Sequence, residues 1–312
     1  MTGIHLDTDL GSDTDDLCAL AMLLGWPGAE LVGVTTCTDP GGRRAGWVRW
    51  ALALAGREDV PVAAGAEGSL GGLFGELVFP DYWPEPIEPA PSPAGEALEL
   101  LARSVASGAT VVAVGPWTNL AMLETERPGM LGGTDVVVMG GHVPPPTDGL
   151  PPWGPRDDWN VQQDAQAARI VLERCDPVVV PIGPCLSATL RSAHVGRLRG
   201  SGALGALVAD QGEAHARDNA RTELGRAYPG LPDDLLNFQY DPLACSVALG
   251  WPGVRIEELD VAIGVDEAGL LQMRLDPSRG RRMRVATGVD GPAFDDAWLD
   301  AVVRASRGNA AP

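Results

Sequence analysis

Short apolar runs and amphipathic stretches alternate along this sequence from the N-terminus to about residue 180. Runs rich in valine and isoleucine predict strands at Ile4–Leu6, Leu31–Thr35, Val60–Ala63, Val111–Val114, Val136–Met139 and Val178–Ile182. Apolar residues at helical spacing predict helices at Leu17–Leu24, Trp47–Ala55, Ala94–Ala106 and Asp164–Arg174. Strands that are apolar on both faces and separated by helices are typical of a parallel sheet covered on both sides. The pattern therefore predicts an α/β fold with a mostly parallel central sheet, built as one domain over residues 1–312.

The C-terminal part has a different pattern, in which short strands are joined by turn residues. A small antiparallel meander is predicted at Val261–Gly264, Leu270–Leu275 and Met283–Thr287, followed by a helix at Phe294–Arg304. Two segments, Phe79–Pro93 and Pro144–Pro155, each contain six prolines and are predicted to be ordered loops or lids. The G-x-G-x-x-G pattern at Gly200–Gly205 follows a polar segment, so we interpret it as a helix start and not as a nucleotide-binding turn.

The charge of the chain restricts its partners. Acidic residues outnumber basic ones by 42 to 23, the formal net charge is −19, and every basic residue is arginine. Such a field repels nucleic acids and anionic membranes. No apolar run approaches the ~20 residues of a membrane span, the N-terminus lacks a signal-peptide pattern, and the five cysteines are scattered. We therefore expect a cytoplasmic protein that binds neither nucleic acid nor membrane.

The segment Asp7–Asp16 contains five aspartates, directly after the first predicted strand and before the first predicted helix. A helix N-terminus favours one or two acidic residues, which is the simpler explanation. Five carboxylates in one short turn repel one another unless a cation neutralises them. Because all-oxygen ligation favours Ca²⁺ or Mg²⁺ over zinc, the segment predicts a metal site.

Two other interpretations of this segment fail on the sequence itself. An EF-hand loop that started at Asp7 would place Gly11 at its fifth position and Cys18 at its twelfth, where acidic ligands are required. Aspartyl phosphotransferases of the haloacid-dehalogenase kind begin in a similar way but generally need a downstream lysine. The chain contains no lysine.

Four blocks, in order along the chain, resemble the inosine–uridine-preferring nucleoside hydrolases. The segment Asp7–Leu20 is similar to the longer variant of the family's opening signature, with two extra residues before the paired aspartates. The other blocks are V-G-P-W-T-N-L-A at Val114–Ala121, M-G-G at Met139–Gly141 with D-W-N at Asp158–Asn160, and D-P-L-A at Asp241–Ala244. The resemblance covers nearly the whole chain. It implies an α/β fold, a Ca²⁺ ion at the carboxyl ends of the strands, a dimer or tetramer, and hydrolysis of ribonucleosides to base and ribose.

The resemblance also implies roles for individual residues. The calcium ligands would be the carboxylates of Asp9, Asp16 and Asp241 and the backbone carbonyl of Thr118, and Asp9 would take a proton from a calcium-bound water. The sugar would be held by Asp15 at a ribose hydroxyl, by Asp158 and Asn160 at the 5′ side, and by packing against Met139. For Thr118 and Met139 the alternatives are a helix cap and a core side chain.

The half of the site that faces the base differs from the family pattern. Tyr240 stands where many members carry a histidine that protonates the departing base, so it could act as an acid, stack on the base or pack at the wall. Asp158 replaces a glutamate, and Thr38-Asp39 replaces a glycine-asparagine pair, so Asp39, like Asp13, could also contact the metal. Two alternatives therefore stay open: the same metal machinery acting on a non-standard riboside, or a non-catalytic protein that binds ribose or nucleosides.

Overall fold

The computed structural model describes residues 1–72, 75–143 and 148–308. Its central sheet has the strand order β10-β9-β11-β6-β5-β4-β1-β2-β3. Six of these strands are mutually parallel: β1 (Thr2–Thr8), β2 (Ala29–Thr36), β3 (Val62–Ala64), β4 (Thr110–Ala113), β5 (Val136–Met139) and β6 (Val178–Val180). Each contains or overlaps one of the apolar runs above. The predicted mostly parallel sheet is therefore confirmed.

The predicted antiparallel meander is present, but it extends the central sheet instead of standing apart from it. Its strands are β9 (Val254–Val265), β10 (Leu271–Leu275) and β11 (Arg281–Val289). Strand β9 pairs antiparallel with both neighbours, and β11 pairs parallel with β6. A separate two-stranded sheet, β7 (Thr189–Arg191) with β8 (Leu235–Phe238), was not apparent from the sequence.

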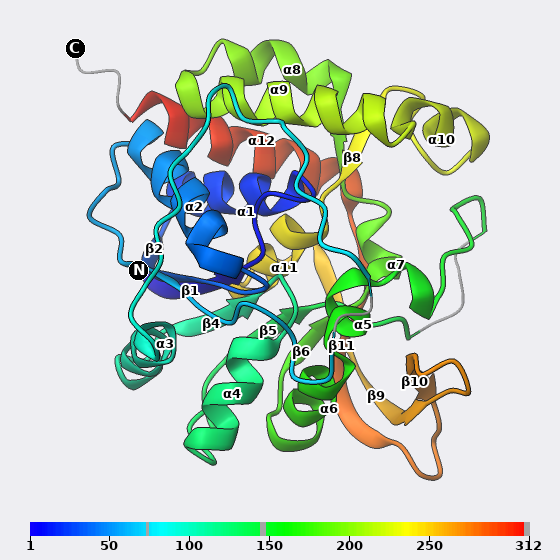
Figure 1. Ribbon diagram of the computed structural model, residues 1–312. Helices are drawn as coiled ribbons and strands as arrows, with labels where there is room; N and C mark the ends of the chain where they lie inside the picture. Colours follow the sequence, from blue (N-terminus) through cyan, green and yellow to red (C-terminus); the bar gives the residue numbers. More distant parts are fainter. Residues whose placement is uncertain (73–74, 144–147, 309–312) are drawn as a thin grey trace.

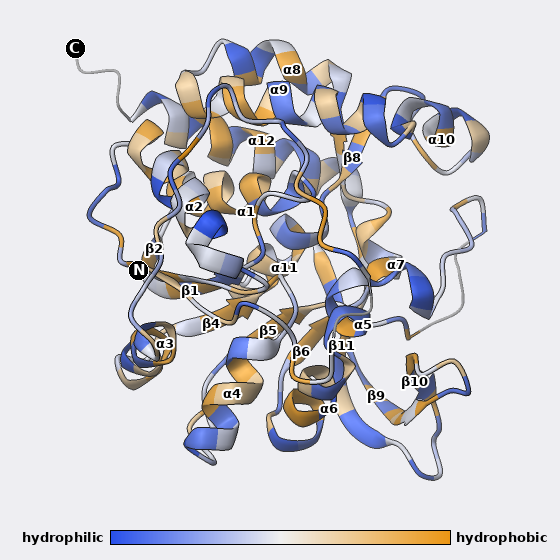
Figure 2. Cartoon of the chain, in the orientation of Figure 1, coloured by the Kyte–Doolittle hydropathy of each residue, from blue (hydrophilic) through white to orange (hydrophobic). Residues whose placement is uncertain are grey.

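Helices cover both faces of the sheet (Figure 1). One face carries α1 (Asp15–Gly25), α2 (Arg43–Leu54), α8 (Ser192–Arg199), α9 (Ala203–Asp218), α11 (Tyr240–Ala248) and α12 (Gly291–Arg307). The other carries α3 (Glu96–Ala106), α4 (Thr118–Glu126) and α6 (Ala165–Arg174). Short helices complete the chain: α5 (Trp159–Gln163), α7 (Ile182–Cys185) and α10 (Arg221–Ala227), with 3₁₀ turns at Pro40–Gly42 and Pro155–Asp157. The central strands are mostly hydrophobic, whereas the helices mix hydrophobic and hydrophilic residues (Figure 2).

The remaining sequence features have simple places in the fold. Gly202 precedes α9, so the glycine-rich match is a helix start, as interpreted. The segment Phe79–Pro93 contains neither helix nor strand and crosses the front of the molecule in Figure 1. Of Pro144–Pro155, residues 144–147 lie outside the described part of the chain, and Pro155 begins a 3₁₀ turn. None of the described helices is long and apolar enough to cross a membrane.

The strand order determines where a ligand can bind. Strand β1 lies between β2 and β4, so the chain runs outward in one direction from β1 to β3 and in the other from β4 to β6. In parallel sheets of this kind the connections on the two sides diverge at that point and leave a crevice beyond the carboxyl ends of the strands. The aspartate-rich segment begins with Asp7 inside β1, and its later aspartates, from Asp9 onward, enter this crevice.

A substitution at Gly25, the last residue of α1, tests the packing of α1 against α12. A Cβ atom at this position would lie 2.6 Å from the amide nitrogen of Ala305 and still closer to the carbonyl oxygen of Ala301. Backbone atoms cannot rotate away, so Gly25→Ala is expected to lower the free energy of unfolding by ~1–3 kcal/mol, measured by urea denaturation. Gly196→Ala in α8 is the control, because a Cβ there meets nothing within 4 Å. Equal stability of the Gly25→Ala variant and the wild type would contradict this packing.

Candidate functional site

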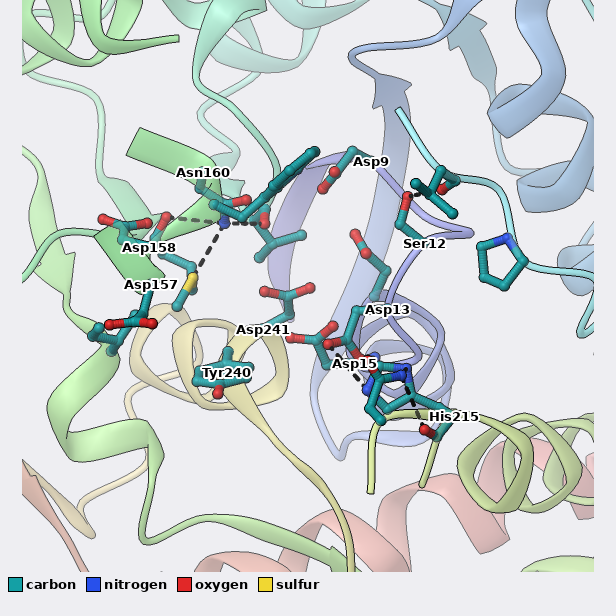
Figure 3. Close-up of a pocket in the computed structure, with 18 of the residues that line it drawn as sticks. Asp9, Ser12, Asp13, Asp15, Asp157, Asp158, Asn160, His215, Tyr240 and Asp241 are labelled. Carbon is teal, nitrogen blue, oxygen red and sulfur yellow. Dashed lines mark hydrogen bonds and ion pairs between the residues drawn. The ribbon is translucent and has the colours of Figure 1, made fainter. Parts of the chain in front are cut away.

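A cavity of about 710 Å³ lies at the carboxyl ends of the central strands. This volume is in the range of small-molecule sites. Eight of the sequence-predicted site residues line it: Asp9, Asp15, Asp16, Met139, Asp158, Asn160, Tyr240 and Asp241. In Figure 3 the labelled aspartates of this set, together with Asn160 and Tyr240, surround one open space. The structure thus brings together residues that are up to 232 positions apart (9 to 241) in the chain.

Three carboxylates form the centre of the cavity. Asp15 and Asp16 begin α1, Asp241 lies in the first turn of α11, and one oxygen from each lies within 4.8 Å of the others. All three side chains are buried, and burial together with mutual repulsion raises the pKa of each well above its usual range. The two helix N-termini and the Thr8 hydroxyl, which donates to Asp16, offset only part of this repulsion. A divalent cation fits this all-oxygen set.

Asp9 lines the same cavity but is outside this group of three. Its carboxylate lies 3.9 Å from the guanidinium of the fully buried Arg44, which also donates to the carbonyls of Asp9 and Leu10. Burial raises the pKa of Asp9, and Arg44 counteracts the rise. Gly115 permits the close approach of β4, because a Cβ there would lie 2.7 Å from Asp9 Oδ1. Asp9 is therefore held in place from two sides.

The structure places Thr118 away from the cavity. It is the first residue of α4, its hydroxyl donates to Asp164 Oδ2 at 2.8 Å, and it is not among the lining residues. A carbonyl in the first turn of a helix accepts the amide four residues further on, so it points along the helix. From this segment it is Val114, directly after β4, that lines the cavity.

Asp158 and Asn160 fix the opposite wall. Asp158 accepts the amide of Gly141 at 2.5 Å and that of Val161 at 3.2 Å, which caps α5, and burial raises its pKa to about 6. The Asn160 amide donates to the carbonyl of Val114 at 2.5 Å and contacts Met139 Sδ at 3.1 Å. These contacts join α5 to the ends of β4 and β5.

Asp39 and Asp13, which the sequence left as possible further metal ligands, have different surroundings. Asp39 accepts the Arg44 amide at 2.7 Å and the Thr36 hydroxyl at 2.7 Å, so it holds the start of α2 and does not line the cavity. Asp13 does line it, and accepts from Asn237 Nδ2 at 2.5 Å. His215 and Arg221 outweigh the effect of burial and lower the pKa of Asp13.

The wall beyond Tyr240 consists mainly of residues that sequence reasoning missed. The Tyr240 ring lies 5.6 Å from that of Phe238, which contacts Trp153 edge-on at 5.3 Å. Burial raises the pKa of the Tyr240 hydroxyl. His215 from α9 and Arg221 from α10 also line the cavity. No motif marks these two residues, because only the packing of α9 and α10 brings them to the site.

Comparison with known proteins gives consistent matches. Residues 4–296 match the family described as inosine-uridine preferring nucleoside hydrolase. The pyrimidine-specific ribonucleoside hydrolase RihA of Salmonella paratyphi A is 31% identical over 216 residues, which are 64% of this chain and 66% of RihA, slightly under two thirds of its length.

Solved structures match over nearly their full length. The purine-preferring ribonucleoside hydrolase from Gardnerella vaginalis has a TM-score of 0.77 at 22% identity and covers 98% of this chain and 99% of its own. The plant nucleoside hydrolase PpNRh1 has a TM-score of 0.77 at 21% identity, covering 97% and 99%. At these identities the likeness establishes the shared fold.

Proposed function

Because the chain belongs to the inosine-uridine preferring nucleoside hydrolase family, we propose that it hydrolyses the N-glycosidic bond of ribonucleosides to free base and ribose, with calcium as its cofactor. The observation that carries this proposal is the group of buried carboxylates from Asp15, Asp16 and Asp241 at the centre of a nucleoside-sized cavity. Without a cation these groups repel one another. Selection for stability alone would not place them together.

Asp16 and Asp241 would hold the ion through their carboxylates, with Asp9 at the edge of the same set. We assign the backbone contribution of the β4 segment to Val114 and not to Thr118, because Val114 lines the cavity. When bound, calcium supplies positive charge that neutralises the carboxylates, lowers the pKa of a nearby water and orients the ribose hydroxyls. Asp15 would share a ribose hydroxyl, since it lies beside Asp16 on the cavity side of α1.

Asp9 would act as the general base that takes the proton from the attacking water. Its burial raises its affinity for a proton, while Arg44 keeps the carboxylate fixed and partly neutralised. Removing a proton in the transition state typically accelerates such a step by about 10²–10⁴-fold. Asn160 and Asp158 would meet the 5′ side of the sugar, and Met139 would pack against the ring, because all three line the cavity on the wall made by β5 and α5.

Tyr240 would form part of the pocket for the base. Its ring packs on Phe238, and its raised pKa keeps the hydroxyl protonated but makes it a weak acid. We therefore favour contact with the base over proton donation as its role.

A turnover assay on three ribosides separates this proposal from its alternatives. Ribose release from inosine, uridine and p-nitrophenyl riboside is measured with calcium and with a chelator. Calcium-dependent release from inosine or uridine is the expected result. Release from the nitrophenyl riboside alone would favour a non-standard substrate. If nucleosides bind in the presence of calcium but no ribose is released, the chain is a non-catalytic binding protein.

A further inference from the structure

Arg221 is the only arginine among the residues that line the cavity in the described part of the chain. Nine carboxylates line the same cavity: Asp9, Asp13, Asp15, Asp16, Glu76, Asp157, Asp158, Asp218 and Asp241. It is the first residue of α10 and follows Ala220, whose φ of 50° is left-handed. This conformation is unfavourable for a non-glycine residue. The turn that delivers Arg221 to the cavity is therefore strained, as turns at functional sites often are.

Aromatic rings hold the guanidinium group of Arg221 in place, but not all of its N–H groups have a hydrogen-bond partner within the described residues. Its central carbon lies 5.8 Å from the ring centroid of Trp153 and 5.5 Å from that of Phe238, so cation–π contacts hold it on the aromatic wall beside Tyr240. Its Nε atom is buried and has no hydrogen-bond partner within the described residues. Arg221 carries five N–H donors, and because it lines the cavity, a ligand there that brings an acceptor can bond to those that the protein leaves unpaired.

His215 is the other nitrogen-bearing group on this wall, and both of its ring nitrogens already have neighbours in the protein with which they interact. Its Nδ1 lies 3.3 Å from Asn219 Nδ2, which also donates to the His215 carbonyl, so Nδ1 acts as an acceptor. The ring proton is then on Nε2, which faces Asp13 Oδ2 at 3.6 Å. Burial lowers the pKa of His215 despite this aspartate. Nε2 lies 3.5 Å from Arg221 Nη2. Because both nitrogens then carry hydrogen, this is a contact between two N–H groups.

We propose that Arg221 is the catalytic residue on the leaving-group side, where it stabilises the base as an anion instead of protonating it. This inference rests on the proposed hydrolysis. The oxygen of water bonds to C1′ of the ribose while its proton passes to Asp9. The C1′–N bond breaks and its electron pair stays on the base, whose ring acceptor receives an N–H of Arg221. The base anion then takes a proton from solvent, and Asp9 returns its proton to solvent.

This role makes the contribution of Arg221 depend on the leaving group. A preorganised donor aimed at developing charge typically accelerates a reaction by about 10²–10³-fold. The effect is largest for a base whose anion is least stable. Among three ribosides the acidity of the leaving group rises from cytosine to uracil to p-nitrophenol, so the need for Arg221 falls in that order.

The test compares kcat and KM of the calcium-loaded wild type and Arg221→Gln on cytidine, uridine and p-nitrophenyl riboside. We expect losses in kcat of about 10²–10³-fold on cytidine, a smaller loss on uridine and less than about fivefold on the nitrophenyl riboside. Added guanidinium is expected to restore part of the cytidine rate of Arg221→Ala. Arg226→Gln is the matched control, because Arg226 is exposed on the same helix.

Retained turnover of the nitrophenyl riboside shows that the variant is folded and that its sugar half works. An equal loss on all three substrates, or a change confined to KM, would overturn the proposal and leave Arg221 a structural or binding role. If the wild type hydrolyses none of the three, the proposed function itself fails. Failure of the proposed function can be told apart from failure of the role of Arg221, because the first is seen in the wild type alone and the second only when the variant is compared with it.

Discussion

Replacing Asp9 with asparagine is expected to lower kcat for ribonucleoside hydrolysis by about 10²–10⁴-fold and to leave the fold intact. The amide has nearly the same shape as the carboxylate but cannot take a proton from water. Arg44 keeps its bonds to the carbonyls of Asp9 and Leu10, which the substitution does not remove. Steady-state rates on uridine and inosine, with thermal melting as a check on folding, provide the measurement.

Asp59→Asn is the control for this substitution, because Asp59 is exposed and pairs only with its neighbour Arg57 in the described part of the chain. Its rate should equal that of the wild type. A rate for Asp9→Asn within about threefold of the control would remove Asp9 from the role of base.

The second large effect concerns Asp241, whose carboxylate adds to the repulsion at the centre of the site. With calcium absent, Asp241→Asn is expected to be more stable than the wild type at pH 8. A carboxyl whose pKa is raised by folding stabilises the fold below the pKa of the unfolded chain, and this stability is lost as pH rises. The free energy of unfolding of the metal-free wild type should therefore fall as the pH rises above about 4, the ordinary pKa of an aspartate, and that of the variant should fall less.

Calcium reverses the ranking of these two proteins. A ligand at 100 times its dissociation constant stabilises the folded state by about 2.7 kcal/mol. The wild type should gain stability of this order on addition of calcium, and Asp241→Asn should gain much less. Urea denaturation with and without calcium measures both effects. An equal gain in the two proteins would show that Asp241 does not hold the ion.

The sequence was sufficient to predict the central sheet because its strands are buried on both faces and each reads as a short apolar run. The pattern placed Val136–Met139 at the strand that the structure contains. It placed only Val261–Gly264 within β9, which begins at Val254. The missing part is exposed and charged, and it is stabilised by pairing with β11 and by contacts such as Arg282 Nε to Glu258 at 3.1 Å. Hydropathy carries no signal for such a strand.

The site, like the sheet, has a part that the sequence predicts and a part that it does not. The half that faces the metal and sugar follows β1, β4 and β5 in compact motifs, so its residues could be chosen from the sequence. Thr118 was chosen from such a motif, but the residue of this segment that meets the cavity is set by where β4 ends, and that residue is Val114, directly after the strand. His215 and Arg221 reach the site only through the packing of α9 and α10 and belong to no motif. Their role could be inferred only from the folded structure.

The most direct measurement of the central claim is the initial rate of ribose release from uridine or inosine by metal-free protein as calcium is added. We expect no detectable release in the presence of chelator, and a rate that rises with calcium and saturates at about one equivalent per chain. The same titration of Asp16→Asn should give little or no release, because one of the three central carboxylates is lost. An undiminished rate in chelator, or a wild-type response from Asp16→Asn, would contradict a calcium-dependent hydrolase built on these aspartates.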